Sequence, residues 1–389
     1  MSVPVAGLSP KVLRWARMRA GLSVETVAAR MKRSGAEIEE WERGDAAPTY
    51  PQLEELARRY HRPIALFFFP EPPKEIPPQD SFRTLPEFEI EELAPHTLLQ
   101  IRHARALQLS LYELNGGVNP SPKKILRETR ILPAPPIAVV AGRVREILGI
   151  DLDVERQKWK SADEALEAWR RAFEDSGVFV FKNSFEQSSV SGFCLHDAEF
   201  PIIYVNNSTA ATRQIFTLFH ELGHLLSGTG GITKTDDSFI RALRGEDRQI
   251  EVFCNAFAAE CILPLASFRA QSSGMEATQH SFEVLARAFK VSREVVARRF
   301  LDQKRLSQVA YERLVARWHQ EYEESRERGG SGGNFYNTHI AYLGEKYLRL
   351  AFGRYYEGAI SREDLGGYLN MKAKTVSGLE DALVSRVTT

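Results

Sequence analysis

The sequence has few cysteines, no long apolar run and no excess of charge of one sign. Its three cysteines form no CxxC pair, which argues against a disulfide framework and against a zinc site built from cysteines. No apolar run approaches the roughly 20 residues that cross a bilayer, and the first residues lack the pattern of a secretory signal. Lys plus Arg and Asp plus Glu each total 51, so overall charge does not argue for a nucleic-acid partner. We therefore expect a soluble, cytoplasmic protein that does not associate with membranes.

What the chain does have is length and apolar residues for several packed cores, since it comprises 389 residues of which 43% are hydrophobic. Proline-rich and acidic stretches, and the glycine-rich Arg326–Gly333, suggest where its segments meet. We expect five segments: a helix-turn-helix domain at 1–70, a linker and helical segment at 71–135, a core at 136–275, a second helix-turn-helix-like segment at 276–325, and a helical module at 334–389.

The central segment is expected to contain a small sheet followed by two long helices. Asn207 or Ser208 would cap a helix that runs to about Ser227, and a second helix would span Gln249–Leu263, where Pro264 follows. Three short apolar segments are typical of strands, the last two joined as a hairpin: Val178–Lys182, Ser191–His196 and Ile202–Asn206. The predicted fold class is mostly helical α+β with a small antiparallel sheet.

The motif that carries chemistry is H-E-x-x-H, at His220, Glu221 and His224. Residues four apart on a helix differ by about 40° in direction and about 6 Å in rise, so both imidazoles project from one face. Two nitrogen ligands on tetrahedral zinc need that placement, and Glu221 beside the first ligand can reach the water bound to the metal. A surface helix with two incidental histidines is the alternative, which the surrounding leucines disfavour.

A catalytic zinc site needs a third protein ligand and an open fourth position. Glu251 is the best candidate by position, with Asn255 one turn later as a group that could orient a ligand. Glu260 is its main rival. Spacing alone also leaves open the acidic residues Asp236, Asp237, Glu246 and Asp247.

Several features between Ser191 and Pro264 form a recognisable set: Gly192-Phe193, the strand Pro201–Asn206, the run from Arg213 to Leu218, HELGH, and the string EVFCNAFAAE with its following Leu-Pro. In these features the stretch resembles the ImmA/IrrE family of metallo-endopeptidases. The resemblance implies a zincin-like peptidase core, one zinc ion per chain, and Glu251 as the third metal ligand beside His220 and His224, with Glu221 as the catalytic base.

The N-terminal segment is similar to the Xre/Cro type of helix-turn-helix domain. The match is carried by Trp41–Gly44, Pro48-Thr49, Gln52-Leu53 and Leu56-Ala57. Members of the combined family cleave a partner transcriptional repressor or occur beside toxin genes as presumed antitoxins. The resemblance therefore implies a protein substrate encoded nearby, and it leaves two functions open: an endopeptidase that cleaves a regulatory protein, or an antitoxin or regulator that binds a toxin or DNA with little turnover. Homo-oligomers are compatible with both.

DNA binding by the helix-turn-helix segments is an open alternative to docking or structural roles. The second helix of the N-terminal motif carries Glu37, Glu39, Glu40 and Glu42, which would repel phosphate. The candidate phosphate contacts are Arg30, Lys32, Arg33 and Arg43 in this motif, and Arg293, Arg298 and Arg299 in the basic helix of the second one. For Cys254, near Glu251, a small buried hydrophobe is favoured over redox control of the metal site.

Overall fold

The computed structural model describes residues 3–82, 85–129, 135–235, 238–328 and 334–387. It divides into two compact units. The N-terminal unit comprises residues 1–80, 87–103 and 185–187, and the main unit comprises residues 81–86, 104–184 and 188–389. Among the described residues no single helix is long and apolar enough to span a bilayer, and one bent helix pair, Gly245–Ile262 with Leu265–Gln271, passes by length and composition only.

Four short helices around one apolar core make up most of the N-terminal unit. The Ser23 and Ser34 side chains cap the second and third helices by accepting hydrogen bonds from the backbone N–H groups of Thr26 and Glu37. Gly44 ends the third helix at φ 85°, which favours glycine. The helices are α1 (Pro10–Arg19), α2 (Val24–Met31), α3 (Gly35–Arg43) and α4 (Tyr50–Tyr60), followed by the 3₁₀ turn η1 (Ile64–Phe68).

The acidic, proline-rich segment after this unit's helices contains two short helices, α5 (Pro78–Ser81) and α6 (Glu87–Glu91). Arg62 pairs with Glu75 through both oxygens of the carboxylate, with 3.0 Å between Arg62 Nη2 and Glu75 Oε2. A long helix, α7 (Pro95–Leu114), follows within the expected helical segment.

The main unit is built around a four-stranded sheet in the order β1-β3-β2-β4. β2 is antiparallel to β3 and to β4, whereas β1 is parallel to β3, so the sheet is mixed rather than wholly antiparallel as we predicted. The strands are β1 (Phe179–Asn183), β2 (Val190–Leu195), β3 (Ile202–Asn206) and β4 (Gly231–Lys234). The first three match the predicted strands to within a residue or two, and β4 was not predicted.

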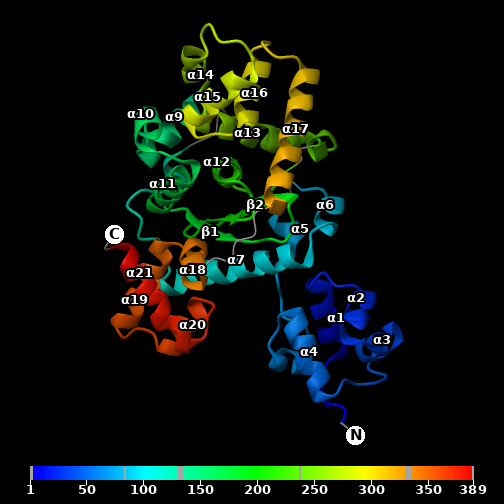
Figure 1. The fold of residues 1–389 in the computed structure, drawn as a ribbon. Coiled ribbons are helices and arrows are strands. Elements are labelled where there is room, and N and C mark those ends of the chain that lie inside the picture. Colours follow the sequence, from blue (N-terminus) through cyan, green and yellow to red (C-terminus); the bar gives the residue numbers. More distant parts are fainter. Residues whose placement is uncertain (1–2, 83–84, 130–134, 236–237, 329–333, 388–389) are drawn as a thin grey trace. The chain divides into compact units, whose positions relative to one another are not determined.

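Two central helices lie in layers on one face of this sheet, α12 (Ala211–Leu226) next to the strands and α13 (Gly245–Ile262) beyond it (Figure 1). Neither Asn207 nor Ser208 caps α12, contrary to the prediction. The Asn206 side chain accepts hydrogen bonds from the N–H and hydroxyl of Ser208, which form a turn, and the helix begins at Ala211. α13 begins four residues before the predicted start.

The remaining elements are helices, as expected for this part of the chain. Before the sheet lie α8 (Ile125–Glu128), α9 (Ile137–Leu148), α10 (Leu152–Lys158) and α11 (Ala162–Asp175). After it come η2 (Ser238–Arg241), α14 (Leu265–Gln271), α15 (Gln279–Phe289), α16 (Arg293–Asp302), α17 (Gln308–Arg328), α18 (Phe335–Leu343), α19 (Glu345–Tyr356), α20 (Arg362–Tyr368), η3 (Ala373–Thr375) and α21 (Val376–Val387). Residues 329–333 of the expected glycine-rich break lie outside the described residues.

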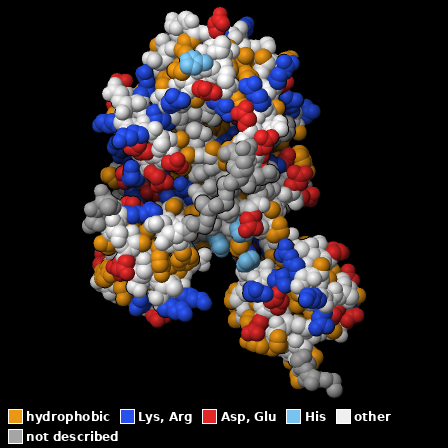
Figure 2. Space-filling view, viewed as in Figure 1, with side chains coloured by type: hydrophobic (Ala, Val, Ile, Leu, Met, Phe, Trp, Pro, Cys, Tyr) orange, Lys and Arg blue, Asp and Glu red, His pale blue; other side chains and the backbone are white. Residues whose placement is uncertain are grey.

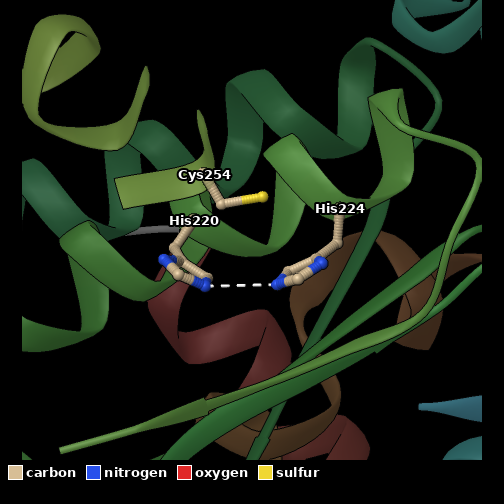
Figure 3. A group of neighbouring side chains, drawn as sticks. All are labelled: His220, His224 and Cys254. Carbon is tan, nitrogen blue, oxygen red and sulfur yellow. Dashed lines mark hydrogen bonds between the residues drawn. The ribbon is translucent and has the colours of Figure 1, made fainter. Parts of the chain in front are cut away.

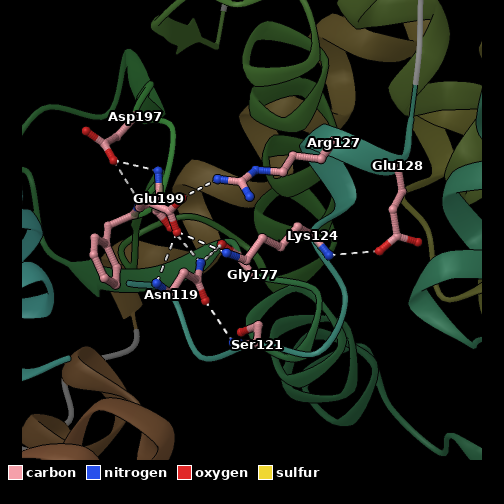
Figure 4. A network of polar contacts seen from close by, with 9 residues as sticks. Asn119, Ser121, Lys124, Arg127, Glu128, Gly177, Asp197 and Glu199 are labelled. Carbon is pink, nitrogen blue, oxygen red and sulfur yellow. Dashed lines mark hydrogen bonds and ion pairs between the residues drawn. The ribbon is translucent and has the colours of Figure 1, made fainter. Parts of the chain in front are cut away.

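A polar network fixes the segment before α9 to the turn between β2 and β3 (Figure 4). Glu199 in that turn accepts hydrogen bonds from Lys124 Nζ at 3.0 Å and from the Asn119 backbone N–H at 3.1 Å, and it also pairs with Arg127. These hydrogen bonds, led by that from Lys124, lower the pKa of the Glu199 carboxyl to about 2. The turn that joins two sheet strands is thereby held in one position.

Candidate metal centre

Two histidines one turn apart on α12 face each other inside the main unit (Figure 3). His220 Nε2 and His224 Nε2 are 3.2 Å apart, and their residues are 2% and 0% exposed. Their helix is amphipathic, and buried leucines at 218, 222 and 225 anchor it in the core. The helix therefore places both imidazoles on one buried face, as the spacing predicted.

Glu251 reaches the same point from α13. Its Oε2 lies 3.5 Å from His220 Nε2, and its Oε1 lies 3.4 Å from His224 Nε2. Donors held at about 2.0–2.1 Å from a tetrahedral zinc ion are separated from each other by about 3.3–3.4 Å. These separations, which involve one Glu251 oxygen for each histidine, fit a zinc ion held between the three side chains.

An unsatisfied polar atom supports the same fit. Among the described residues, Glu251 Oε1 is buried and has no hydrogen-bond partner. Burial alone would raise the pKa of the Glu251 carboxyl, but the adjacent imidazoles of His220 and His224 lower it overall. A buried carboxylate is stable only with compensating positive charge, so this donor set is suited to hold a cation.

Cys254 offers a rival third donor. Its Sγ and the two histidine nitrogens all lie within 4.8 Å of one another (Figure 3), and the thiol is free and buried. Burial raises the pKa of the Cys254 thiol. The Glu251 carboxylate and the Cys254 thiol are therefore both candidates for the third donor beside the two histidines.

Asn255 lies behind the first histidine. Its Oδ1 is 3.0 Å from His220 Nδ1, so an amide oxygen can accept the Nδ1–H hydrogen bond. A proton on Nδ1 leaves the lone pair on Nε2, the atom that faces His224 and Glu251. Asn255 therefore favours the tautomer that a metal ligand needs.

Glu221 is fully buried and faces the sheet. The Thr233 hydroxyl of β4 donates a hydrogen bond to Glu221 Oε1 at 2.5 Å, while Oε2 is buried with no hydrogen-bond partner among the described residues. β4 is four residues long and begins with a glycine, so its alternating pattern is too short to predict a strand. The contribution of Thr233 could not be foreseen for that reason.

Of the other acidic candidates, three lie in the described part of the chain and have positions of their own. Glu260 is paired with Arg299 at 2.8 Å and accepts a hydrogen bond from the Leu265 N–H at the start of α14. Glu246 and Asp247 lie in the first turn of α13. Asp236 and Asp237 are outside the described residues.

Because residue 231 is a glycine, the backbone of β4 packs directly against the imidazole ring of His224. A Cβ atom at this position would be 2.2 Å from His224 Cδ2 and 2.6 Å from its Nε2, closer than real atoms approach. The ring or the strand would have to move to admit any side chain. Gly231 is thus, after Thr233, a second residue near the candidate ligands that no sequence pattern indicated.

We expect Gly231→Ala to weaken zinc binding by about 10–100-fold, the effect usual for groups that orient a metal ligand. Gly142→Ala is the matched control, because a Cβ at Gly142 in α9 meets nothing within 4 Å. Competition with a chromogenic chelator measures both affinities. Equal zinc affinity in the two variants would show that the His224 ring tolerates displacement.

The residues proposed to contact DNA have mixed surroundings. α3 carries the four predicted glutamates, but Glu42 forms a bidentate pair with Arg17 and is largely buried, so it does not contribute to repulsion of phosphate as we expected. Arg33 lies 3.5 Å from Glu37, and Arg43 lies 2.8 Å from Asp45. Arg30 and Lys32 remain as further candidates. Acidic and basic side chains are interspersed on the visible face of this unit (Figure 2).

In the second motif, Arg299 is corrected to a structural residue. It is 7% exposed, and its guanidinium donates to the Leu263 carbonyl and to Glu260, so it cannot reach phosphate. Arg293 and Arg298 are on the surface but are paired with Glu321 and Asp302. Their availability to nucleic acid is reduced accordingly.

We expect the full chain to bind DNA weakly, with a dissociation constant of about 10⁻⁴–10⁻⁶ M at physiological salt, as for non-specific binding. Replacing Glu37, Glu39 and Glu40 by Gln should tighten binding, whereas Glu42→Gln should not, because Glu42 faces Arg17. Mobility-shift assays across a salt series, with DNA from upstream of the gene, measure this. Nanomolar, sequence-selective binding by the unmodified chain would refute it.

Comparison with protein families agrees with both resemblances. Residues 173–301 match the IrrE N-terminal-like domain, a peptidase family, and residues 11–67 match a helix-turn-helix domain. No significant match to a curated protein was found. The first match covers the sheet, α12 and α13, and the second covers α1 to α4. The chain therefore carries an IrrE N-terminal-like peptidase-family domain together with an N-terminal helix-turn-helix domain.

Proposed function

We propose that this protein is a zinc-dependent endopeptidase that cleaves a regulatory protein, with a transcriptional repressor as the favoured substrate. The observation that carries the proposal is the convergence of three buried donors, 3.2–3.5 Å apart, beside a buried glutamate with one unpartnered oxygen. A structural metal site has no need of that glutamate. The match to a peptidase family supports the same function.

In this proposal His220, His224 and Glu251 hold the zinc ion and Glu221 manages the protons. A bound zinc ion would polarise the scissile carbonyl and make a water molecule more acidic. Glu221 Oε2, which has no hydrogen-bond partner in the described part of the chain, accepts a proton from the attacking water and passes it to the leaving amine. Asn255 keeps His220 in the required tautomer through its contact with Nδ1.

We place the substrate along β4. The two inner strands, β2 and β3, are paired on both sides and offer no edge for a peptide. β4 is an outer strand, and its residues 231 and 233 contact His224 and Glu221. An extended peptide that adds to its outer edge would bind through main-chain hydrogen bonds, close to the donors.

The helix-turn-helix domain in the same chain supports a regulatory partner. The test is to mix the purified protein with the product of the adjacent gene, with and without a chelator, and to look for fragments. We expect fragments that the chelator abolishes. If the partner is bound and inhibited but never cut, the protein is instead a binding regulator such as an antitoxin.

A further inference from the structure

We infer that Thr233 is a positioning residue for the general base: its hydroxyl fixes the Glu221 carboxylate so that Oε2 is presented to the reaction. This inference rests on the proposed peptidase function and concerns a residue of β4, outside the helix that carries the motif. The donor is the Thr233 Oγ1 hydroxyl, and the acceptor, 2.5 Å away, is Glu221 Oε1.

Both partners of this hydrogen bond are buried, which increases its influence on the position of the Glu221 carboxylate. Thr233 is 2% exposed and Glu221 is 0% exposed, so water does not compete for either group. A buried carboxylate without a partner is costly, and a carboxylate with one oxygen held can present only the other. In the described part of the chain, the Glu221 oxygen without a hydrogen-bond partner is Oε2.

The strand that carries Thr233 is itself held in register. Thr233 pairs with Gly192 of β2, and a Cβ at Gly192 would lie 2.6 Å from Thr217 Cγ2 of α12. This glycine lets the sheet approach the helix closely. Two residues along β4, Gly231 contacts His224 in the same way, so the alternate residues 231 and 233 both face α12. β4 thus sets the position of a ligand ring and of the base together.

A hydroxyl is the right group for this role. It donates one hydrogen bond and carries no charge, so it orients the carboxylate without neutralising it as Lys or Arg would. The hydroxyl also holds Glu221 Oε1, which could otherwise rotate toward His220 and His224 on the same helix. Valine has nearly the same shape but cannot donate, so Thr233→Val removes only the hydrogen bond.

The experiment compares Thr233→Val, Thr233→Ser and the control Thr217→Val in zinc-loaded full-length protein. Thr217 is also buried, but among the described residues its hydroxyl donates to the Arg213 carbonyl in its own helix and not to Glu221. The substrate probe is an internally quenched fluorescent peptide, chosen from a mixed set because the wild type cleaves it. We expect kcat to fall by about 10–100-fold in Thr233→Val with KM unchanged, and Thr233→Ser and Thr217→Val to stay within about 3-fold of the wild type.

Two further readouts do not depend on turnover. Zinc content should be equal in all variants, and the same peptide should bind equally to Glu221→Gln and to Glu221→Gln/Thr233→Val, in which the buried charge is absent and folding is not at risk. The inference is overturned if Thr233→Val keeps full kcat, loses zinc, or is not rescued by serine. If the wild type cleaves no peptide and no partner protein, the proposed function itself fails, which is a different result.

Discussion

Glu251→Gln should purify with much less than one zinc ion per chain, as should His220→Ala and His224→Ala, while the fold persists. The donors are 3.2–3.5 Å apart, and losing any one leaves two ligands. We expect zinc affinity to fall by more than about 100-fold, since loss of groups behind the ligands already costs about 10–100-fold. The leucine-rich face of α12 remains buried in each variant, so the helix should stay packed.

Cys254→Ala is the control for this prediction, because its Sγ is the rival donor near both histidines. It should retain full zinc. Elemental analysis of the purified proteins, with circular dichroism to follow folding, gives the answer. Zinc retained by Glu251→Gln and lost by Cys254→Ala would transfer the third-ligand role to the thiol.

Glu221→Gln should retain zinc, fold and partner affinity but lose about 10²–10⁴-fold in cleavage rate, the usual loss when a general base is removed. The amide still accepts the Thr233 hydrogen bond through its oxygen, so the side chain keeps its place. It has no lone pair of sufficient basicity to take a proton from water. Cleavage of the adjacent gene's product, followed by gel electrophoresis, measures the rate.

A binding assay on the same samples separates loss of chemistry from loss of binding. Partner affinity should be equal for the wild type and Glu221→Gln. Undiminished cleavage by the variant would assign the proton transfer to another group. Loss of binding together with cleavage would indicate that the site has collapsed.

The helix that carries H-E-x-x-H could be predicted because its pattern depends only on residues that are close in sequence. Positions 220 and 224 share a helix face whatever surrounds them, and the strands at 179–183, 190–195 and 202–206 are strongly apolar. The resemblance, rather than spacing, selected Glu251 from the acidic candidates. The distances to both histidines now support that choice.

What could not be predicted depends on packing between distant segments. β4 has too few residues to show a period, so neither Gly231 nor Thr233 could be connected with the site. Arg299 belongs to a helix that is basic in sequence. Its guanidinium is nevertheless buried, because it pairs with Glu260 and donates to the Leu263 carbonyl at the end of α13. Glu42 is likewise engaged by Arg17 from another helix. The charges along one helix do not reveal ion-pair partners that other elements supply.

Zinc titration of stripped protein tests the central claim most directly. The metal is removed with a chelator, zinc is added back in known amounts, and the initial rate of fragment formation from the partner is measured. A single site formed by His220, His224 and Glu251 predicts no cleavage without metal and a linear rise that ends at one zinc ion per chain. Full cleavage by metal-free protein, or partner binding without cleavage at any zinc concentration, would contradict it.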